Sequence, residues 1–215
     1  MMSLYKDREF LLSVGTGFLL LIASLGAFFF SANYANLNAS NSVADIILSN
    51  TRAYDVGDIF VYGVLTMIAF LAVLVVSRPR YLPFTLKSIA LLYFVRSLFV
   101  SMTHISAYPY RATLEASYFL TSNFFRAFFT GDDLFFSGHV ALPFLIALIF
   151  WQNVWLRAIF LIASAVFAIV VLLGHFHYTI DVFSAYFITY SIYVIARRLF
   201  RKDFARIYAQ AAPVG

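Results

Sequence analysis

Residues 131–139 have the sequence GDDLFFSGH and residues 175–181 have the sequence HFHYTID, and these two polar islands interrupt a hydrophobic part of the chain. Three of the 4 histidines in the 215-residue sequence lie in them. Apolar runs separate the islands and follow the second one, so each island is expected at the end of a membrane-spanning segment. Ionisable groups at such positions are costly in free energy, and they usually mark a functional site.

The composition predicts a polytopic membrane protein. Hydrophobic residues make up 63% of the chain and charged residues only 12%, whereas soluble domains average about 45–50% and about 25%. The mean hydropathy is +0.87. At about 20 residues per span, the length allows five or six helices but no second domain, so we expect residues 1–215 to form a single membrane-embedded domain. The sequence contains no cysteine, which excludes disulfides and thiolate chemistry.

The apolar runs predict an all-α fold with six transmembrane helices. We place the spans at residues 10–31, 58–77, 86–106, 136–152, 158–175 and 180–197. The first run is too long for the core of a signal peptide, so we expect a retained helix. The two long connections are residues 32–57 and 107–135, and the aromatic side chains of the second predict an interfacial helix.

The basic residues predict the orientation of the bundle. With the N-terminus inside, most of them fall on inner segments: Lys6, Arg8, Arg78, Arg80, Lys87, Arg157, Arg197, Arg198, Arg201, Lys202 and Arg206. The positive-inside rule therefore predicts that both termini are cytoplasmic. All the histidines and most of the acidic residues then fall at the extracytoplasmic face. The basic run near the C-terminus is expected to contact anionic lipid rather than nucleic acid.

His177 and Asp181 have the i, i+4 spacing that puts two side chains on one face of a helix. A carboxylate that binds one imidazole nitrogen fixes the tautomer and leaves the other nitrogen free as a nucleophile or base. The alternative is a polar helix cap, in which Thr179 and Asp181 satisfy amides at the helix end. Taken alone, the spacing does not decide between these two roles.

Ser137, Gly138 and His139 begin the predicted fourth span. The N-terminus of a helix offers unpaired N–H groups and the positive end of the helix dipole, and glycine lets an oxyanion approach the backbone closely. His139 is then placed to protonate a leaving oxygen. The alternative is again capping, with Ser137 as the N-cap residue and with Asp132 and Asp133 interacting with the dipole.

The two motifs together, with Arg96 in the third predicted span, favour a catalytic site over three unrelated caps. A zinc site is the main competitor, because histidine and aspartate are zinc ligands. However, His175 and His177 are separated by one residue at a turn, and neither an HExxH pattern nor a cysteine accompanies them. We therefore predict chemistry that needs no metal and no other cofactor.

Three segments resemble signatures of the sphingomyelin synthase family. Residues 131–139, with the pattern GDxxxFSGH, resemble the third signature, and residues 177–182, with the pattern HYTxDV, resemble the fourth. Tyr93, Arg96 and Thr103, at their spacing in the third predicted span, look like the second. This family is a branch of the type 2 phosphatidic acid phosphatase (PAP2) superfamily.

The resemblance implies a six-span helical bundle with its active site at the outer membrane face. It also implies that His139, His177 and Asp181 form the catalytic triad. We expect the substrate and its phosphate to be bound by a further set of residues: Arg96, Ser137, Gly138, Asp132 and Tyr178.

The chain departs from the family patterns in ways that bear on the reaction. The first signature has no intact match, and residues 55–58 preserve only an aspartate at its expected position. The phosphatase branch carries an arginine where this chain has Val171, and the dipeptide Arg78-Pro79 lies on the predicted cytoplasmic side. These differences favour the synthase-like branch over a generic phosphatase.

We therefore expect a lipid phosphotransferase that moves phosphocholine or phosphoethanolamine from a glycerophospholipid to a lipid alcohol such as ceramide, through a phosphohistidine. The alternative is a lipid phosphate phosphohydrolase with water as the acceptor, and a small membrane transporter is a third hypothesis. Both donor and acceptor are membrane lipids, and the compact loops favour a bacterial inner membrane over a Golgi or plasma membrane. The sequence does not identify the head group, the acceptor, the oligomeric state or the roles of His104 and His175.

Overall fold

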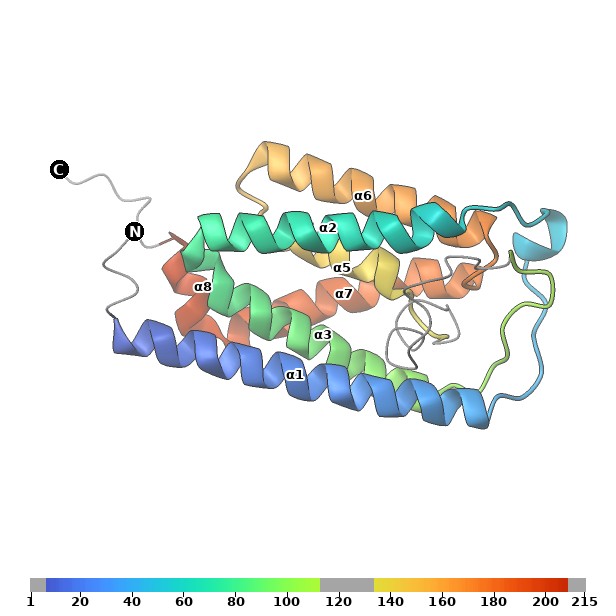
Figure 1. The fold of residues 1–215 in the computed structure, drawn as a ribbon, viewed down its shortest axis with the longest axis horizontal. Helices are drawn as coiled ribbons and strands as arrows, with labels where there is room; N and C mark the ends of the chain where they lie inside the picture. Colours follow the sequence, from blue (N-terminus) through green and yellow to red (C-terminus); the bar gives the residue numbers. More distant parts are fainter. Residues whose placement is uncertain (1–6, 113–133, 209–215) are drawn as a thin grey trace.

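The computed structural model describes residues 7–112 and 134–208, and all regular secondary structure in these two ranges is helical. The prediction of an all-α fold is therefore confirmed. The α-helices, coloured along the chain in Figure 1, are α1 (Arg8–Leu37), α2 (Gly57–Ser77), α3 (Leu82–Met102), α5 (Gly138–Ile149), α6 (Val154–Leu173), α7 (Thr179–Leu199) and α8 (Arg201–Tyr208). Two 3₁₀ turns, η2 (Leu48–Asn50) and η3 (Pro79–Tyr81), lie in the connections.

Within the two described ranges, five helices are long and apolar enough to cross a membrane: α1, α2, η3 with α3, α6 and α7. Helix α5 is apolar but only 12 residues long, so the predicted fourth span, residues 136–152, is shorter than expected. Most of its side chains are buried, as expected for a helix that is hydrophobic on all sides and lies inside a bundle. The apolar helices are consistent with an integral membrane protein.

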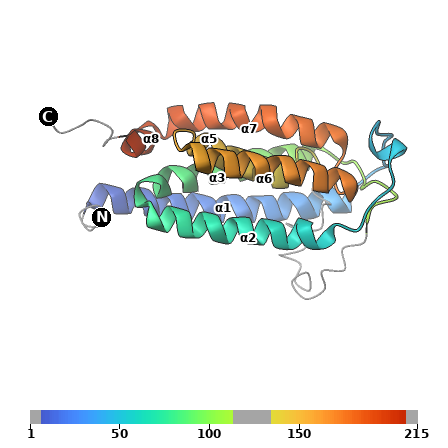
Figure 2. The same cartoon turned by 90° about the horizontal axis from the view of Figure 1, so that it is seen from above.

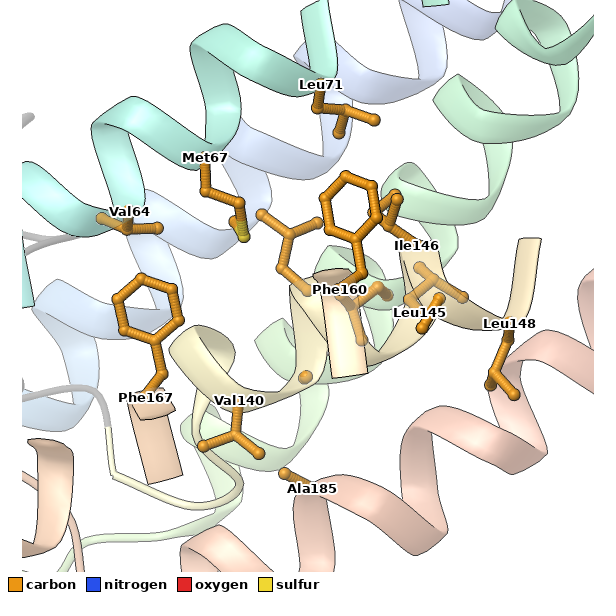
Figure 3. Close-up of a cluster of buried hydrophobic side chains, with 14 of the residues drawn as sticks. Val64, Met67, Leu71, Val140, Leu145, Ile146, Leu148, Phe160, Phe167 and Ala185 are labelled. Carbon is orange, nitrogen blue, oxygen red and sulfur yellow. The ribbon is translucent and has the colours of Figure 1, made fainter. Parts of the chain in front are cut away.

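Helix α5 forms the centre of the hydrophobic core. It packs against α6 and α7, whereas α1 packs along α3 (Figures 1 and 2). Figure 3 shows side chains from several helices meeting around α5, including Met67 of α2, Phe160 and Phe167 of α6 and Ala185 of α7. Because α5 is packed by its neighbours along its length, the position of its first residues is held by the hydrophobic core.

The two ends of the bundle differ in what they contain. The start of α1 and the whole of α8 lie at one end, and the loops after α1 and α3 lie at the other (Figure 1). Backbone hydrogen bonds join the loops at this second end: Ser40 N to His104 O (2.7 Å), Tyr54 N to Leu173 O (2.8 Å) and Ala112 N to Gly174 O (3.0 Å). Helices α5 and α7 both begin at this end of the bundle, where the hydrogen-bonded loops hold one another in place.

Several helix boundaries differ from the predicted spans for local reasons. Helix α3 begins at Leu82, four residues before the predicted start at residue 86, because Pro83 suits the first turn of a helix. Helix α6 begins at Val154 because the Asn153 side chain accepts a hydrogen bond from the amide of Leu156. Residues 113–133, where most of the predicted interfacial helix falls, lie outside the described residues.

Candidate active site

His177 and Asp181 lie together at the start of α7. Nδ1 of His177 is 3.2 Å from Oδ2 of Asp181, and both side chains are buried. The same carboxylate oxygen accepts a hydrogen bond from the amide of Tyr178 (3.1 Å), which is the N-cap residue of the helix. The carboxylate thus caps α7 and contacts the imidazole at once, so the two roles considered from the sequence are compatible. Nε2 of His177 is left as the nitrogen away from the carboxylate.

Ser137 and His139 contribute two unpaired polar atoms at the start of α5. Ser137 is the N-cap residue, but its side chain makes no capping hydrogen bond. Its Oγ and the Nε2 of His139 are both buried, and neither has a hydrogen-bond partner among the described residues. Buried polar atoms are rarely left without a partner in folded proteins. Two such atoms lie within one turn of helix here, so both are available to a polar ligand.

The starts of α5 and α7 are joined directly. The amide of Ser137 donates a hydrogen bond to the backbone carbonyl of Asp181 (3.0 Å), although the two residues are far apart in sequence. Both His177 and Arg96 lie within electrostatic reach of His139. The structure therefore brings the two sequence motifs and the arginine of α3 into one site.

Arg96 fixes the geometry around Gly138. The guanidinium is buried, and its Nε donates a hydrogen bond to the carbonyl of Phe136 (3.1 Å). A Cβ on Gly138 would lie only 2.6 Å from Nη1 of Arg96, so no other residue leaves the guanidinium where it is. A cation held against a helix N-terminus that also offers free amides is suited to binding a phosphate group.

The backbone before this helix adopts an unusual conformation. Phe135 and Phe136 have φ angles of 88° and 30°, in the left-handed region that bulky side chains rarely occupy. Phe136 is fully buried, and its carbonyl accepts the hydrogen bond from Arg96. Non-glycine residues in this region cost conformational free energy and persist only when the surrounding structure holds them. They are concentrated at functional sites. Nothing in the sequence predicted this conformation.

An aromatic layer holds the imidazole of His139. The ring of Phe60, from the first turn of α2, stacks on it with 3.8 Å between centroids and an angle of 21° between planes. Phe176 in turn contacts Phe60, with 4.4 Å between centroids. A Cβ on Gly174 would lie 2.3 Å from the ring of Phe176, so this glycine leaves room for the layer. Sequence reasoning missed Phe60 and Phe176.

Tyr178 was predicted to bind substrate, but its hydroxyl is engaged with the loops. It donates to the carbonyl of Ser106 (2.8 Å) and receives a hydrogen bond from the amide of Val43 (3.3 Å). His175, in the left-handed region at φ 55°, also serves the loops: Nε2 is 3.2 Å from Thr51 Oγ1, and Nδ1 is 3.1 Å from the Tyr110 carbonyl.

Two further residues from the sequence analysis, His104 with no assigned role and Asp132 with a predicted one, stand apart from this geometry. Nε2 of His104 lies 3.1 Å from the carbonyl oxygen of Ser101 in its own segment. Asp132, expected to bind substrate, falls outside the described residues. Its role stays a prediction.

Asp45 supports the site from the first loop, and it was not among the predicted site residues. Its carboxylate accepts hydrogen bonds from the amide (2.7 Å) and hydroxyl (2.6 Å) of Thr179, the first residue of α7. The amides of Ile47 and Leu48 also donate to it. Burial alone would raise the pKa of Asp45, but these hydrogen bonds together outweigh it and lower the pKa below its ordinary value. A loop carboxylate thus fixes the first turn of α7, which contains Asp181 and directly follows His177 and the N-cap residue Tyr178.

The metal-free prediction remains a prediction. Among the described residues, no three or more His, Cys, Asp and Glu side chains lie close enough to form a metal site. The site instead consists of a histidine–aspartate pair, a second histidine and an arginine at the meeting point of two helix N-termini. Such a set can bind an anion, supply a nucleophilic nitrogen and transfer a proton.

Fold and site together define a helical membrane protein with paired histidines and a buried arginine at one end of the bundle. Residues 131–198 match the family model described as PAP2 superfamily C-terminal. The match contains both histidine motifs and runs from the start of the site through most of α7, and it supports membership of the PAP2 superfamily. This family fits a membrane enzyme of the lipid phosphatase or phosphotransferase type. Searches of curated proteins and of solved structures gave no significant match.

Proposed function

We propose that the protein is an integral-membrane lipid phosphotransferase. It moves a phosphocholine or phosphoethanolamine group from a glycerophospholipid to a lipid alcohol such as ceramide. The observation that carries the proposal is that the His177–Asp181 pair, the unpaired Nε2 of His139 and the guanidinium of Arg96 all lie around the joined starts of α5 and α7. This arrangement supplies a nucleophile, a proton donor and a phosphate-binding cation.

In the first step, Nε2 of His177 attacks the phosphorus of the donor lipid. A phosphorus–nitrogen bond forms, and the bond from phosphorus to the glyceride oxygen breaks. His139, protonated at this stage, gives its proton to the departing oxygen, so diacylglycerol leaves as a neutral alcohol. Asp181 stabilises the imidazolium character that develops on His177, because it contacts Nδ1 of the same ring.

In the second step, His139 is neutral and acts as the base. It takes the proton of the acceptor hydroxyl, whose oxygen attacks phosphorus while the bond to His177 breaks. This returns both histidines to their starting states. Arg96 and the amides at the start of α5 stabilise the negative charge on the phosphate oxygens during both displacements. Two displacements with inversion give net retention of configuration at phosphorus.

The site end of the bundle faces away from the cytoplasm in this proposal, and both termini are cytoplasmic. The distribution of basic residues supports that orientation. The short loops favour a bacterial inner membrane. Transfer rather than hydrolysis is favoured by Val171, which occupies the position of a phosphatase-branch arginine and is fully buried in α6.

The test is a partitioning assay with purified protein in mixed micelles. A fluorescent phospholipid is offered with and without ceramide, and products are separated by chromatography. We expect more head-group transfer product than free phosphorylated head group when ceramide is present. Release of only water-soluble phosphate products, whichever lipid alcohol is offered, would replace the transferase by the phosphohydrolase alternative.

Matched variants test the assignment of the site in the same assay. His177→Ala and Asp181→Asn each remove a member of the proposed catalytic unit, and turnover should fall by about a thousandfold or more. His175→Asn is the control, because asparagine tolerates the left-handed backbone at this position. It should keep most of the activity. Loss of activity in His175→Asn but not in His177→Ala would show that the nucleophile is assigned wrongly.

A further inference from the structure

A basic cavity lies at the end of the bundle opposite the candidate active site. Its volume is about 540 Å³, and its walls come from α1, α3, the end of α7 and α8. Five of its lining side chains are cationic: Lys87, Arg198, Arg201, Lys202 and Arg206. Two are acidic, Glu9 and Asp203. The cavity therefore has an excess of positive charge.

The acidic group at the bottom of the cavity is already neutralised. Nζ of Lys87 lies 2.6 Å from Oδ2 of Asp203, and Asp203 is buried. The hydroxyl of Ser13 connects them, since it accepts a hydrogen bond from Lys87 (2.7 Å) and donates one to Asp203 (2.6 Å). This network joins α1, α3 and α8, so the cavity has a fixed base.

The carboxylates near Arg206 are also paired with a cation. Arg206 contacts Asp203 (3.4 Å) and Glu9 (3.5 Å), with Asp7 at 3.9 Å. Within the part of the chain that the structure describes, Arg198, Arg201 and Lys202 make no ion pair or side-chain hydrogen bond. Three cations on one cavity are thus left without an internal counter-charge.

The side chains around the cavity combine exposed apolar residues with cations, as a binding site for a phospholipid requires. Leu12 and Leu199 line it and are 59% and 63% exposed. Exposed leucines on apolar helices are suited to contact acyl chains, whereas the adjacent cations are suited to a phosphate. Arginine binds phosphate oxygens through two parallel N–H donors, and clusters of basic residues at the ends of membrane helices attract anionic lipids.

We propose that this cavity binds the phosphate of an anionic phospholipid head group, at a site separate from the catalytic one. The lipid phosphate sits among Arg198, Arg201 and Lys202, and its acyl chains extend along Leu12 and Leu199. A lipid bound here holds α8 against α1 and α3, because the cavity is formed by all three. The proposal does not depend on the reaction at the other end of the bundle.

The experiment is native mass spectrometry of the full-length protein in neutral detergent. Phosphatidylglycerol and phosphatidylcholine with matched acyl chains are offered together. Wild-type protein should retain the anionic lipid in clear preference, and His177→Ala should retain it equally. Because phosphatidylcholine can also occupy the proposed catalytic site, the deciding signal is phosphatidylglycerol: failure of wild-type protein to retain it would overturn the proposal without the use of any variant, and would leave the proposed catalytic function untouched.

Two triple variants locate the bound lipid. The combined changes Arg198→Gln, Arg201→Gln and Lys202→Gln should lower retention of phosphatidylglycerol at least about tenfold, because each lost cation weakens the attraction. The combined changes Arg8→Gln, Arg78→Gln and Arg80→Gln remove the same charge at the same end but outside the cavity, and should retain the lipid. Equal loss in both variants would show unspecific attraction and overturn the site.

A further experiment tests whether the cavity binds a phospholipid or only free phosphate. Inorganic phosphate is added at millimolar concentration to wild-type protein that holds phosphatidylglycerol. The lipid should stay bound, since its acyl chains contribute contacts that inorganic phosphate lacks. Displacement of the lipid at this concentration would show that the cavity is a site for the free anion, which contradicts the proposal.

Discussion

Gly138 lies so close to Arg96 that a Cβ at this position would be 2.6 Å from Nη1 and 3.0 Å from Cζ of the guanidinium. The contact couples the first residue of α5 to a buried cation of α3. Because the guanidinium also donates to the carbonyl of Phe136, a shift of Arg96 disturbs the backbone that precedes the helix. The absence of a side chain at position 138 is therefore a requirement of the site.

Gly138→Ala should displace the guanidinium and reduce activity more than stability. We expect kcat/KM to fall by at least about tenfold, because the guanidinium is displaced but not removed, and complete removal of one such donor typically costs about a hundred- to a thousandfold. Steady-state assays and thermal unfolding measure the two effects. Gly26→Ala is the control, because a Cβ there meets nothing within 4 Å. Unchanged kcat/KM in Gly138→Ala would show that the position of Arg96 is unimportant.

Phe60→Leu tests whether the aromatic layer orients His139. Leucine keeps a hydrophobic side chain in the buried position but removes the ring that stacks on the imidazole at 3.8 Å. Aromatic pairs contribute about 0.5–1.5 kcal/mol beyond burial, so kcat should fall several-fold while KM changes little. Phe70→Leu, on the same helix but half-exposed, is the matched control. A fall in stability with unchanged kcat would assign Phe60 a purely structural role.

Asp45→Asn should destabilise the protein in a way that depends on pH. The folded-state pKa of Asp45 is lower than its ordinary value, so its ionised form contributes stability above the unfolded pKa of about 3.9. That contribution is lost as the pH falls through the folded-state pKa. Thermal unfolding should therefore show a lower melting temperature for Asp45→Asn at pH 7 and a smaller difference below about pH 4.

The control for Asp45 is another carboxylate of the same loop. Asp55 is exposed and lies just before α2, so Asp55→Asn should melt close to the wild-type temperature at both pH values. A difference between wild type and Asp45→Asn that is the same at pH 7 and at a pH well below the folded-state pKa of Asp45 would exclude the ionised carboxylate as its cause.

The proposed orientation can be tested with single cysteines, since the chain has none of its own. Ala44 lies exposed in the loop at the site end, and Ala205 lies exposed on α8 at the other end. A membrane-impermeant maleimide should label Ala44→Cys in intact cells and Ala205→Cys only after permeabilisation. The opposite pattern would place the site on the cytoplasmic side and remove the proposed outer-leaflet substrate.

The sequence predicted the parts of the site that depend on short spacing. The spacing of His177 and Asp181 predicted their contact, although in the structure His177 precedes the N-cap residue of α7 and the contact is made across the helix cap rather than along the helix. The contact between the two histidine motifs has no such local basis, because the hydrogen bond from Ser137 to Asp181 depends on how α5 and α7 pack. It could be expected only from the presence of both motifs in one chain. Local patterns do not contain such long-range information.

The supporting residues could not be predicted for a different reason. Phe60 and Phe176 are two of 26 phenylalanines in a hydrophobic chain. The sequence around them therefore does not distinguish these two rings, which pack beside His139, from the others. Asp45 caps a helix that begins 134 residues later. The length of α5 was overestimated because hydropathy does not distinguish an exposed apolar span from a short helix buried in protein.

The most direct test of the central claim is to identify the residue that carries the head group. The enzyme is mixed with a phospholipid donor without an acceptor alcohol, quenched in alkali, and examined by intact-protein and peptide mass spectrometry. The proposed mechanism predicts a phosphorylated head group bonded to His177 in wild-type protein and no adduct in His177→Ala. An adduct on His139, or turnover without any adduct under conditions that preserve phosphohistidine, would contradict the role of the His177–Asp181 pair as the nucleophile.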